Sequence, residues 1–341
     1  MSYPAVAADR SRWILAQRPD LTQERQRLPV DRPSGWILEE EPDGNGVARK
    51  GVTVFLTNSE CPWRCLMCDL WKHTTLAPVP PGAIPAQIDW ALRDADRGSV
   101  DYLKLYNAGS FFDPRAIPPS DLPAIADRAR RFQKLVVECH PRLVGDRCVE
   151  FRDQLAGTTC LEVAMGLETA HPGVLERLNK RITTDDFARA VEFLKRAQIA
   201  VRTFILVKPP FLDESESLEW AKRSIDFAFD CGVDVVSLIP TRSGNGAMEE
   251  LELRQVFSPP RIETLHAVLL YGLRQGRGRV FVDLWDLDRL CSDAGVAANW
   301  KIQFHSINLR QTINPKFILA NPSSPWSKDG ELPAQSSNEK I

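Results

Sequence analysis

Seven short apolar runs recur along the chain, and longer amphipathic segments separate them. The runs are rich in Val, Ile, Leu and aromatic residues, which predicts β-strands. They cover 52–58, 102–107, 135–140, 161–168, 201–208, 233–240 and 280–285. Apolar residues at helical spacing between them predict helices at 84–96, 122–132, 185–198, 217–232 and 262–274. This alternation indicates an α/β fold with a parallel sheet that closes, fully or partly, into a barrel with helices outside.

The two ends of the chain depart from this alternation. Residues 1–50 form an N-terminal extension, with a helix expected near 21–28 and a strand–turn–strand hairpin over 36–55. The predicted barrel covers 51–285, and its seventh strand either extends the barrel or pairs with the C-terminal extension, 286–320. The tail at 321–341 is polar and rich in Ser and Pro, so we expect it to be disordered.

Strand alternation places polar side chains inside the barrel. In the run at 161–168, Glu162, Gly166 and Glu168 alternate with apolar residues that face the helices. The same rule gives further inward positions to Glu138, His140, Arg202 and Lys208. Unpaired burial of charge is very costly, so these groups require partners or a ligand. Pairing with one another is one alternative, and a solvated strand end is another for Lys208 and His140.

Composition narrows the class of protein. The net charge of −2 gives no global indication of a nucleic-acid partner, and 43% hydrophobic residues suffice for a large core in a chain of 341 residues. Eight cysteines are too few for a disulfide scaffold. Five are scattered in or beside apolar segments and are expected to be buried thiols: Cys139, Cys148, Cys160, Cys231 and Cys291. The absence of a long apolar stretch or signal-peptide pattern predicts a cytoplasmic protein without a membrane partner.

The remaining cysteines, Cys61, Cys65 and Cys68, form a CxxxCxxC motif directly after the first apolar run. Three thiolates so close in sequence suit three corners of a cubane 4Fe–4S cluster, and the fourth iron then stays open to a small molecule. Two alternatives remain at this point. The three cysteines with His73 provide four ligands for zinc, which describes a non-catalytic metal protein, or the thiols are unligated.

The CxxxCxxC spacing resembles that of the radical S-adenosylmethionine superfamily. This resemblance implies an open six-stranded (β/α) barrel and S-adenosyl-L-methionine bound to the open iron. One electron from the cluster then generates a 5′-deoxyadenosyl radical, which abstracts hydrogen from a substrate. The residue before the last cysteine, Met67, is often aromatic in that family, and we expect Trp63 and Trp71 to supply apolar cover instead.

The same resemblance implies a binding site for S-adenosylmethionine. Ala108, Gly109 and Ser110 follow the second strand, where the family carries a glycine-rich segment whose backbone binds the methionine amino group. An ordinary strand–helix turn explains these residues equally well.

Two further motifs, ECHPR at 138–142 and MGLETAHPGVLERLNK at 165–180, resemble the branch that contains oxygen-independent coproporphyrinogen oxidase. They imply that Glu138 and Glu168 contact the ribose and that Lys180 meets the methionine carboxylate. The alternative for Lys180 is a helix C-terminal cation.

The motifs SFFD, ECHP, GLET and VKPPF together resemble the branch of the Elongator-type catalytic subunit and the radical subunit of archaeosine synthase, over roughly residues 50–275. We take Arg202, Lys208 and Arg242 as substrate candidates, with the loop at 239–246 as a movable cover. For Arg242, loop solubility is an equal explanation.

The implied partners are a reductant such as flavodoxin or ferredoxin and a small-molecule or nucleotide-containing substrate. A tRNA or nucleobase substrate is the alternative, although net charge does not support tRNA. The identity of the substrate, the electron donor, the fate of S-adenosylmethionine and the oligomeric state do not follow from the sequence.

Overall fold

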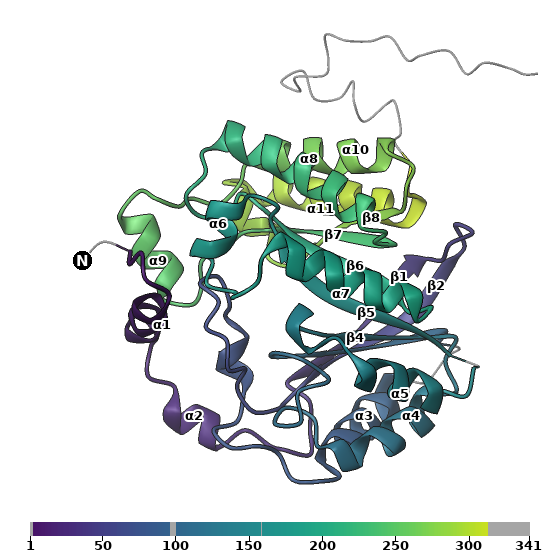
Figure 1. Cartoon of the computed structure of the whole chain (residues 1–341). Coiled ribbons are helices and arrows are strands. Elements are labelled where there is room, and N and C mark those ends of the chain that lie inside the picture. The colour runs from purple at the N-terminus through teal and green to yellow at the C-terminus, as the bar shows by residue number, and fades with distance from the viewer. Residues whose placement is uncertain (1–2, 96–99, 158, 313–341) are drawn as a thin grey trace, which may run out of the picture. The chain divides into compact units, whose positions relative to one another are not determined.

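A single curled sheet of eight strands organises the protein (Figure 1). The structure, a computed structural model, describes residues 3–95, 100–157 and 159–312. The strands lie in chain order, and the neighbours from β2 to β8 are parallel, whereas β1 pairs antiparallel with β2. They are β1 Gly35–Pro42, β2 Ala48–Leu56, β3 Tyr102–Asn107, β4 Lys134–Glu138, β5 Cys160–Glu168, β6 Ala200–Val207, β7 Val235–Pro240 and β8 Arg279–Val282.

This arrangement confirms the α/β half-barrel that the alternating runs predicted. The seventh predicted strand extends the barrel as β8, and the predicted hairpin exists as β1 and β2. The extension before residue 50 therefore contributes one strand to the sheet. The expected disordered tail at 321–341 lies outside the described residues.

Helices cover the outer face of the sheet (Figure 1). Five were predicted from their apolar spacing, namely α3 Ala83–Ala95, α4 Leu122–Ala129, α7 Thr184–Arg196, α8 Glu214–Asp230 and α10 Ile262–Arg274, and a sixth, α2 Thr22–Gln26, lies within the segment expected near 21–28. The sequence patterns missed α1 Ala7–Ala16, α5 Asp146–Gln154, α6 Pro172–Arg177, α9 Ala247–Leu253 and α11 Ala294–Arg310. Most of these are short or have a weak apolar face, which explains why periodicity did not reveal them.

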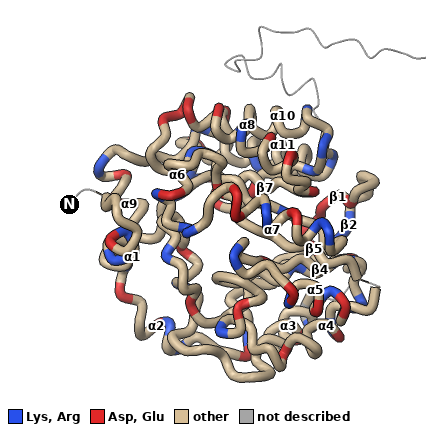
Figure 2. The backbone as a smooth tube through the Cα atoms, in the orientation of Figure 1, with Lys and Arg blue, Asp and Glu red and all other residues tan. Residues whose placement is uncertain are grey.

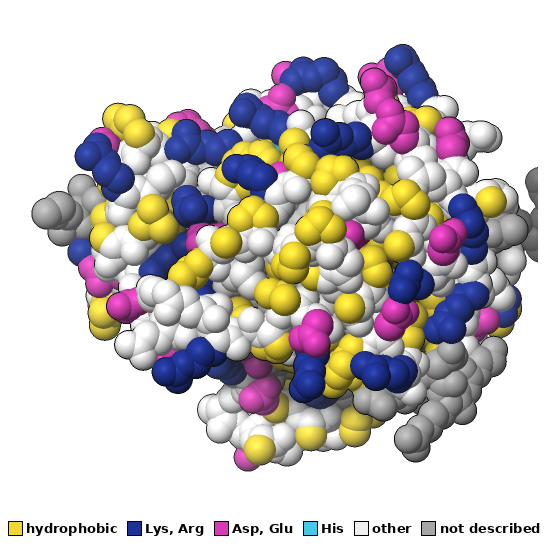
Figure 3. All heavy atoms as spheres, turned by 90° about the horizontal axis from the view of Figure 1, so that it is seen from below, with side chains coloured by type: hydrophobic (Ala, Val, Ile, Leu, Met, Phe, Trp, Pro, Cys, Tyr) yellow, Lys and Arg dark blue, Asp and Glu magenta, His cyan; other side chains and the backbone are white. Residues whose placement is uncertain are grey.

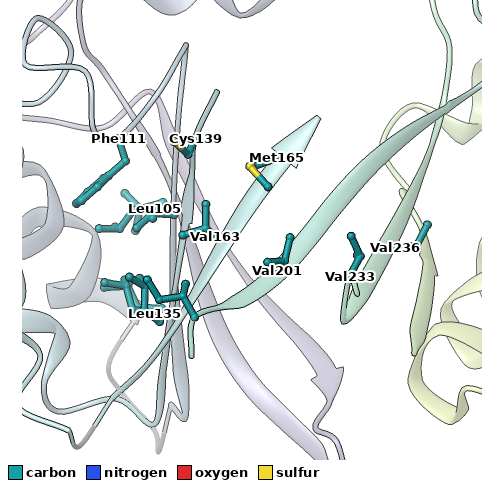
Figure 4. Close-up of a cluster of buried hydrophobic side chains, with 14 of the residues drawn as sticks. Leu105, Phe111, Leu135, Cys139, Val163, Met165, Val201, Val233 and Val236 are labelled. Carbon is teal, nitrogen blue, oxygen red and sulfur yellow. The ribbon is translucent and has the colours of Figure 1, made fainter. Parts of the chain in front are cut away.

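The hydrophobic core lies between the sheet and these outer helices (Figure 4). Val163, Met165 and Leu167 of β5 are fully buried in it, as their alternation with polar residues predicted. Neighbouring strands contribute Leu105, Leu135, Val201 and Val236 to the same cluster. The opposite face of each strand is thereby left for the barrel interior.

Two side chains, Asn308 of α11 and Gln311 directly after it, hydrogen-bond to the backbone at the free edge of β8. The Asn308 amide exchanges two hydrogen bonds with the backbone of Val282, at 2.9 and 2.8 Å. The Gln311 amide does the same with Val280, at 2.8 and 2.9 Å. Arg279 also donates to the carbonyl of Pro42 in β1, at 2.8 Å, which links the first and last strands. A sheet edge that would otherwise be open to pairing with other chains is therefore capped within the chain.

A buried ion network fills the amino-terminal part of the barrel interior. The Arg202 guanidinium is 2% exposed and donates to Glu162 at 2.6 Å and to Glu41 of β1 at 2.6 Å. Lys104 forms a further ion pair with Glu41. Burial alone would raise the pKa of Glu162, but Arg202, Lys134 and Arg279 lower it to about 2. Arg202 thus pairs with carboxylates inside the barrel, which was the alternative to a role in substrate binding. It lies near the amino end of β6, whereas a substrate residue was expected at the carboxyl end.

Acidic and basic residues are mixed over the chain (Figure 2). The face seen from below carries acidic and basic side chains scattered among apolar ones (Figure 3). Among the described residues, none of the helices is both long enough and apolar enough to cross a bilayer.

Candidate cofactor site at the carboxyl ends of the strands

The three motif cysteines lie on one loop that leaves the carboxyl end of β2. Cys61, Cys65 and Cys68 precede a short 3₁₀ helix at Leu70–His73. Their thiols lie close enough to raise one another's pKa values. Burial is the larger cause, and the pKa of each thiol reaches about 12. Three adjacent thiols that are neutral on their own suit a bound cationic centre, because a metal stabilises the thiolate form.

Two asparagines from distant segments hold this loop in place. The Asn179 amide donates to the carbonyl of Arg64 at 2.7 Å. The Asn245 amide donates to the carbonyls of Leu66 at 2.7 Å and Cys68 at 3.1 Å. Sequence reasoning missed both residues, because no local pattern connects them to the cysteines. Asn245 belongs to the loop at 239–246 that was predicted to move as a cover, so this loop is hydrogen-bonded to the cysteine loop at one residue.

The N-terminal extension also packs against the cysteine loop. Trp13 and Ile14 of α1 share a small apolar cluster with Leu66, and Met67 packs against this cluster. Glu60 directly precedes the motif and pairs with Arg18 at 2.7 Å and with Arg25 at 2.9 Å. The extension therefore covers the loop that carries the predicted ligands.

Gly109 brings the predicted glycine segment directly against the first cysteine. Its φ of +113° is a conformation that residues with a side chain rarely adopt, and a Cβ added there would lie 3.1 Å from the Cβ of Cys61 and 3.4 Å from its sulfur. The neighbouring carbonyl of Ala108 accepts from Asn58 at 3.0 Å, and the Ser110 hydroxyl donates to the Cys139 sulfur at 3.4 Å. The structure thus joins two of the predicted site segments, 61–68 and 108–110.

We expect Gly109→Ala to displace the cysteine loop. The added methyl group meets Cys61, and the left-handed backbone is unfavourable for Ala, so a loss of roughly 1–3 kcal/mol of stability is expected. Urea unfolding measures this loss, and iron content after anaerobic reconstitution measures the damage to the loop. Gly157→Ala is the matched control, because Gly157 has a φ of +72° with no atom near the added Cβ. Equal iron content and equal stability in the two variants would contradict the contact.

Glu138 ends β4 beside this segment. Its carboxylate accepts from the backbone N–H of Asn107 at 3.0 Å. Burial raises the pKa of Glu138 to about 7. The side-chain amide of Asn107 is buried, and neither its nitrogen nor its oxygen has a hydrogen-bond partner among the described residues. Such orphaned polar atoms beside a carboxyl group suit a polar ligand at this edge.

Glu168 and Lys180 form an ion pair on the other side of the cysteine loop. The Lys180 ammonium lies 2.7 Å from the Glu168 carboxylate, and both side chains are largely buried. Burial alone would lower the pKa of Lys180, but Glu168, Cys65 and Cys61 raise it. Gly166 makes room for the pair, since a Cβ there would lie 2.0 Å from the carboxylate and 2.5 Å from the ammonium. The structure thereby brings Glu168 and Lys180 to the cysteines.

Trp63 lies flat on His140, with ring centroids 3.8 Å apart. Burial and Lys180 lower the pKa of His140 to about 3, so the ring is neutral. Its Nε2 atom lies 3.0 Å from the carbonyl of Lys180. Trp71 is buried under the Arg18 guanidinium, 4.5 Å from the ring centroid. Trp63 thus packs on His140 and Trp71 under Arg18, and the apolar cover of the cysteine loop by these rings stays a prediction.

The two other substrate candidates lie at the ends of β6 and β7. The Lys208 ammonium donates to the carbonyl of Ser258 at 3.0 Å and pairs with Glu214 at 3.3 Å. Arg242 donates to the carbonyl of Trp285 at 2.8 Å and to Asp283 at 3.4 Å. Both residues therefore stand at the carboxyl edge of the sheet, where ligands of α/β barrels bind.

The zinc alternative requires ligands that converge on one ion. In the part of the chain that the structure describes, His, Cys, Asp and Glu residues form no group of three or more arranged to hold a single metal ion. Cysteines of a cubane bind different irons and do not have to meet at one point. Three thiols on one loop beside a lysine and two carboxyl groups are a donor set that suits a cluster with a small polar ligand.

Comparisons with known proteins agree with this arrangement. Residues 56–222 match the model of the Radical SAM superfamily. The chain is 28% identical to the archaeosine synthase subunit beta of Methanosarcina acetivorans over 234 residues, which are 66% of this chain and 67% of that protein. It is 30% identical to the protein of the same description from Thermococcus kodakarensis over 178 residues, which are 51% of this chain and 55% of that protein.

Among solved structures, the chain is similar to Elp3 of Methanocaldococcus infernus. The two share 17% sequence identity and a TM-score of 0.47, and the match covers 66% of this chain and 58% of that one.

Proposed function

This chain belongs to the Radical SAM superfamily, and we propose that it uses a 4Fe–4S cluster to cleave S-adenosylmethionine reductively and abstract hydrogen from a substrate. Membership of this family implies that the chain binds a 4Fe–4S cluster and S-adenosylmethionine. The observation that carries the proposal is the approach of two different segments to the cysteine loop, Gly109 from the turn after β3 and Lys180 from the turn after α6. A glycine cradle and a buried cation are what a ligand with amino and carboxylate groups requires beside an open iron.

Each residue then has a defined role. Cys61, Cys65 and Cys68 hold three irons, and the backbone at 108–110 accepts the amino group of S-adenosylmethionine. Lys180 meets the methionine carboxylate as a point charge. Its ion pair with Glu168 keeps the ammonium oriented toward the cysteine loop.

Glu138 and Glu168 are assigned to the ribose hydroxyl groups. A carboxylate accepts hydrogen bonds from hydroxyl groups, and a protonated carboxyl group also donates one. Because the pKa of Glu138 is about 7, this residue is able to act in either form near neutral pH. Glu168 remains an acceptor beside the Lys180 ammonium, so the two carboxyl groups are suited to different hydroxyl orientations.

Anaerobic reconstitution tests this proposal directly. We expect about four irons per chain and, after reduction, formation of 5′-deoxyadenosine from S-adenosylmethionine. The electron is expected from a small reductant such as flavodoxin or ferredoxin, with dithionite as its chemical substitute. A reconstituted protein that binds zinc but no iron, or that holds four irons and leaves S-adenosylmethionine intact, would contradict the proposal.

A nucleobase carried by tRNA is the second candidate substrate. Similarity to two proteins described as archaeosine synthase subunit beta supports it. The mixed charge of the surface does not by itself favour tRNA over a small molecule (Figure 2). To distinguish tRNA from a small-molecule substrate, the reduced enzyme is incubated with deuterated tRNA and, separately, with a deuterated small-molecule extract. Deuterium appears in deoxyadenosine only when the deuterated material contains the molecule that donates the hydrogen.

A further inference from the structure

Two buried N–H donors beside the cysteine loop have no hydrogen-bond partner among the described residues. One is the Nε–H of Arg18, which lies between α1 and α2, and the other is the indole Nε1–H of Trp71, three residues after Cys68. A buried donor without an acceptor costs free energy, and most such groups in folded proteins are therefore paired. The two donors thus call for an acceptor that the described part of the chain does not supply.

The two donors belong to side chains that pack on each other. The Arg18 guanidinium lies over the Trp71 ring, 4.5 Å from its centroid. Trp71 is 4% exposed and the Arg18 side chain is 9% exposed, so both are shielded from bulk water. The donors therefore share one poorly solvated region, where a hydrogen bond is stronger than it is at the surface.

Glu60 restricts the orientation of the Arg18 guanidinium. This residue directly precedes Cys61, and its carboxylate accepts a hydrogen bond from Arg18 Nη1 at 2.7 Å. Because the guanidinium is planar and stacked on Trp71, the bond at Nη1 also restricts the direction of the Nε–H. The Arg18 side chain thereby takes its position from the same loop that carries the predicted cluster ligands.

Arg18 lies close to Cys68, the third of these ligands. A Cβ added to Gly246 would lie 3.4 Å from the Cα of Arg18. The residue before Gly246 is Asn245, whose amide donates to the carbonyl of Cys68 at 3.1 Å. Burial raises the pKa of Cys68 to about 12, and the Arg18 charge acts against this increase. The N-terminal extension therefore brings a cation to the Cys68 end of the cysteine loop.

The sulfur atoms of an iron–sulfur cluster are acceptors that fit these donors. Thiolate and sulfide sulfurs carry negative charge, and N–H groups that bond to them help to set the reduction potential of the cluster. Such bonds raise the potential, because reduction adds negative charge that the donors stabilise. A nearby positive charge acts in the same direction. Arg18 supplies both a donor and a charge, whereas Trp71 supplies a neutral donor.

We propose that the Nε–H of Arg18 and the Nε1–H of Trp71 donate hydrogen bonds to sulfur atoms on the Cys68 side of the cluster and raise its reduction potential. This role rests on the proposed function, because it concerns the same cluster. It gives the N-terminal extension a part in the chemistry in addition to covering the loop. With a higher potential, a weaker reductant is sufficient to provide the electron for cleavage of S-adenosylmethionine.

Redox titration of the anaerobically reconstituted whole chain, followed by electron paramagnetic resonance, tests this role. Arg18→Met removes the donor and the charge, and we expect about tenfold less reduced cluster at the midpoint potential of the wild type. For a one-electron couple this is a decrease of about 59 mV. Trp71→Phe removes only the N–H and keeps a ring beneath Arg18. We expect about threefold less reduced cluster there, because a neutral donor forms a hydrogen bond roughly half as strong.

Arg25→Met is the matched control for the loss of an arginine beside the loop. Arg25 also pairs with Glu60, at 2.9 Å, but its Nε already donates to the carbonyl of Thr74 at 3.0 Å. The midpoint potential of this variant should equal that of the wild type, and iron content should be the same in all four proteins. Equal decreases in Arg18→Met and Arg25→Met would show that a general change in the loop, and not the free N–H, sets the potential.

An unchanged midpoint potential in Arg18→Met or in Trp71→Phe would overturn the assignment of that donor, and is the result expected if water accepts its hydrogen bond. Deoxyadenosine formation by the wild type is measured in the same preparation. A wild type that holds four irons and cleaves S-adenosylmethionine, together with unchanged potentials in both variants, would refute this role and leave the proposed function intact. A wild type that takes up no cluster would contradict both.

Discussion

Cys65→Ala is expected to abolish both iron loading and cleavage of S-adenosylmethionine. A cubane held by Cys61 and Cys68 alone would lack one of its three predicted ligands, and the groups beside Cys65, the Lys180 ammonium and the Glu168 carboxylate paired with it, supply no thiolate. We expect substoichiometric iron and no deoxyadenosine above background in this variant, and about four irons per chain in the wild type. Iron analysis, the visible absorption of the cluster and chromatography of deoxyadenosine provide the measurements.

Cys160→Ala is the control for this prediction. Cys160 was expected to be buried but is exposed, because it is the first residue of β5, at the opposite end of that strand from Glu168. Its iron content and activity should match those of the wild type. Deoxyadenosine formation by Cys65→Ala at the rate of this control would remove the cysteine loop from the proposed mechanism.

Arg202→Leu is expected to cause the largest loss of stability. The substitution leaves Glu41 and Glu162 buried without their main partner, and breaking a buried ion pair typically costs about 3–5 kcal/mol. Lys104 still pairs with Glu41, and Lys134 lies 3.7 Å from Glu162, so the lower part of that range is expected. Urea unfolding of the apoprotein by circular dichroism measures the difference.

Arg196→Leu is the control for the effect of burial, because it removes the same charge from an exposed ion pair. Arg196 pairs with Glu192 on the exposed side of α7, with side-chain exposures of 78% and 58%. Exposed pairs of this kind contribute about 0–1 kcal/mol, so the variant should unfold close to the wild type. Losses of similar size in Arg202→Leu and Arg196→Leu would show that the ion network does not stabilise the barrel.

Local sequence patterns predicted those features of the structure that depend on residues close together in the chain. The apolar runs predicted the parallel strands, and the alternation in β5 correctly placed Val163, Met165 and Leu167 against the helices. The CxxxCxxC spacing identified the family because all three predicted ligands come from one loop of eight residues, 61–68. The predicted roles of Glu138, Glu168 and Lys180 depend on the resemblance and remain predictions.

Local patterns could not predict contacts between residues that are far apart in the chain. Glu41 lies in a segment read as an extension, yet it completes the ion network with Arg202, 161 residues away. Asn245 anchors the cysteine loop from 177 residues beyond Cys68. Pairing of Arg202 with Glu41 and Glu162 depends on which strands become neighbours.

The chain by itself therefore determined which segments form strands, which face each strand buries and where the three thiols lie. These features depend on a spacing of two to four residues, which backbone geometry fixes locally. Only the tertiary structure decided that Gly109 contacts Cys61, that Lys180 pairs with Glu168 and that Arg202 belongs to the barrel floor. Curling of the sheet brings residues together that are tens to hundreds of positions apart, and the energy of such contacts depends on burial, which no local pattern contains.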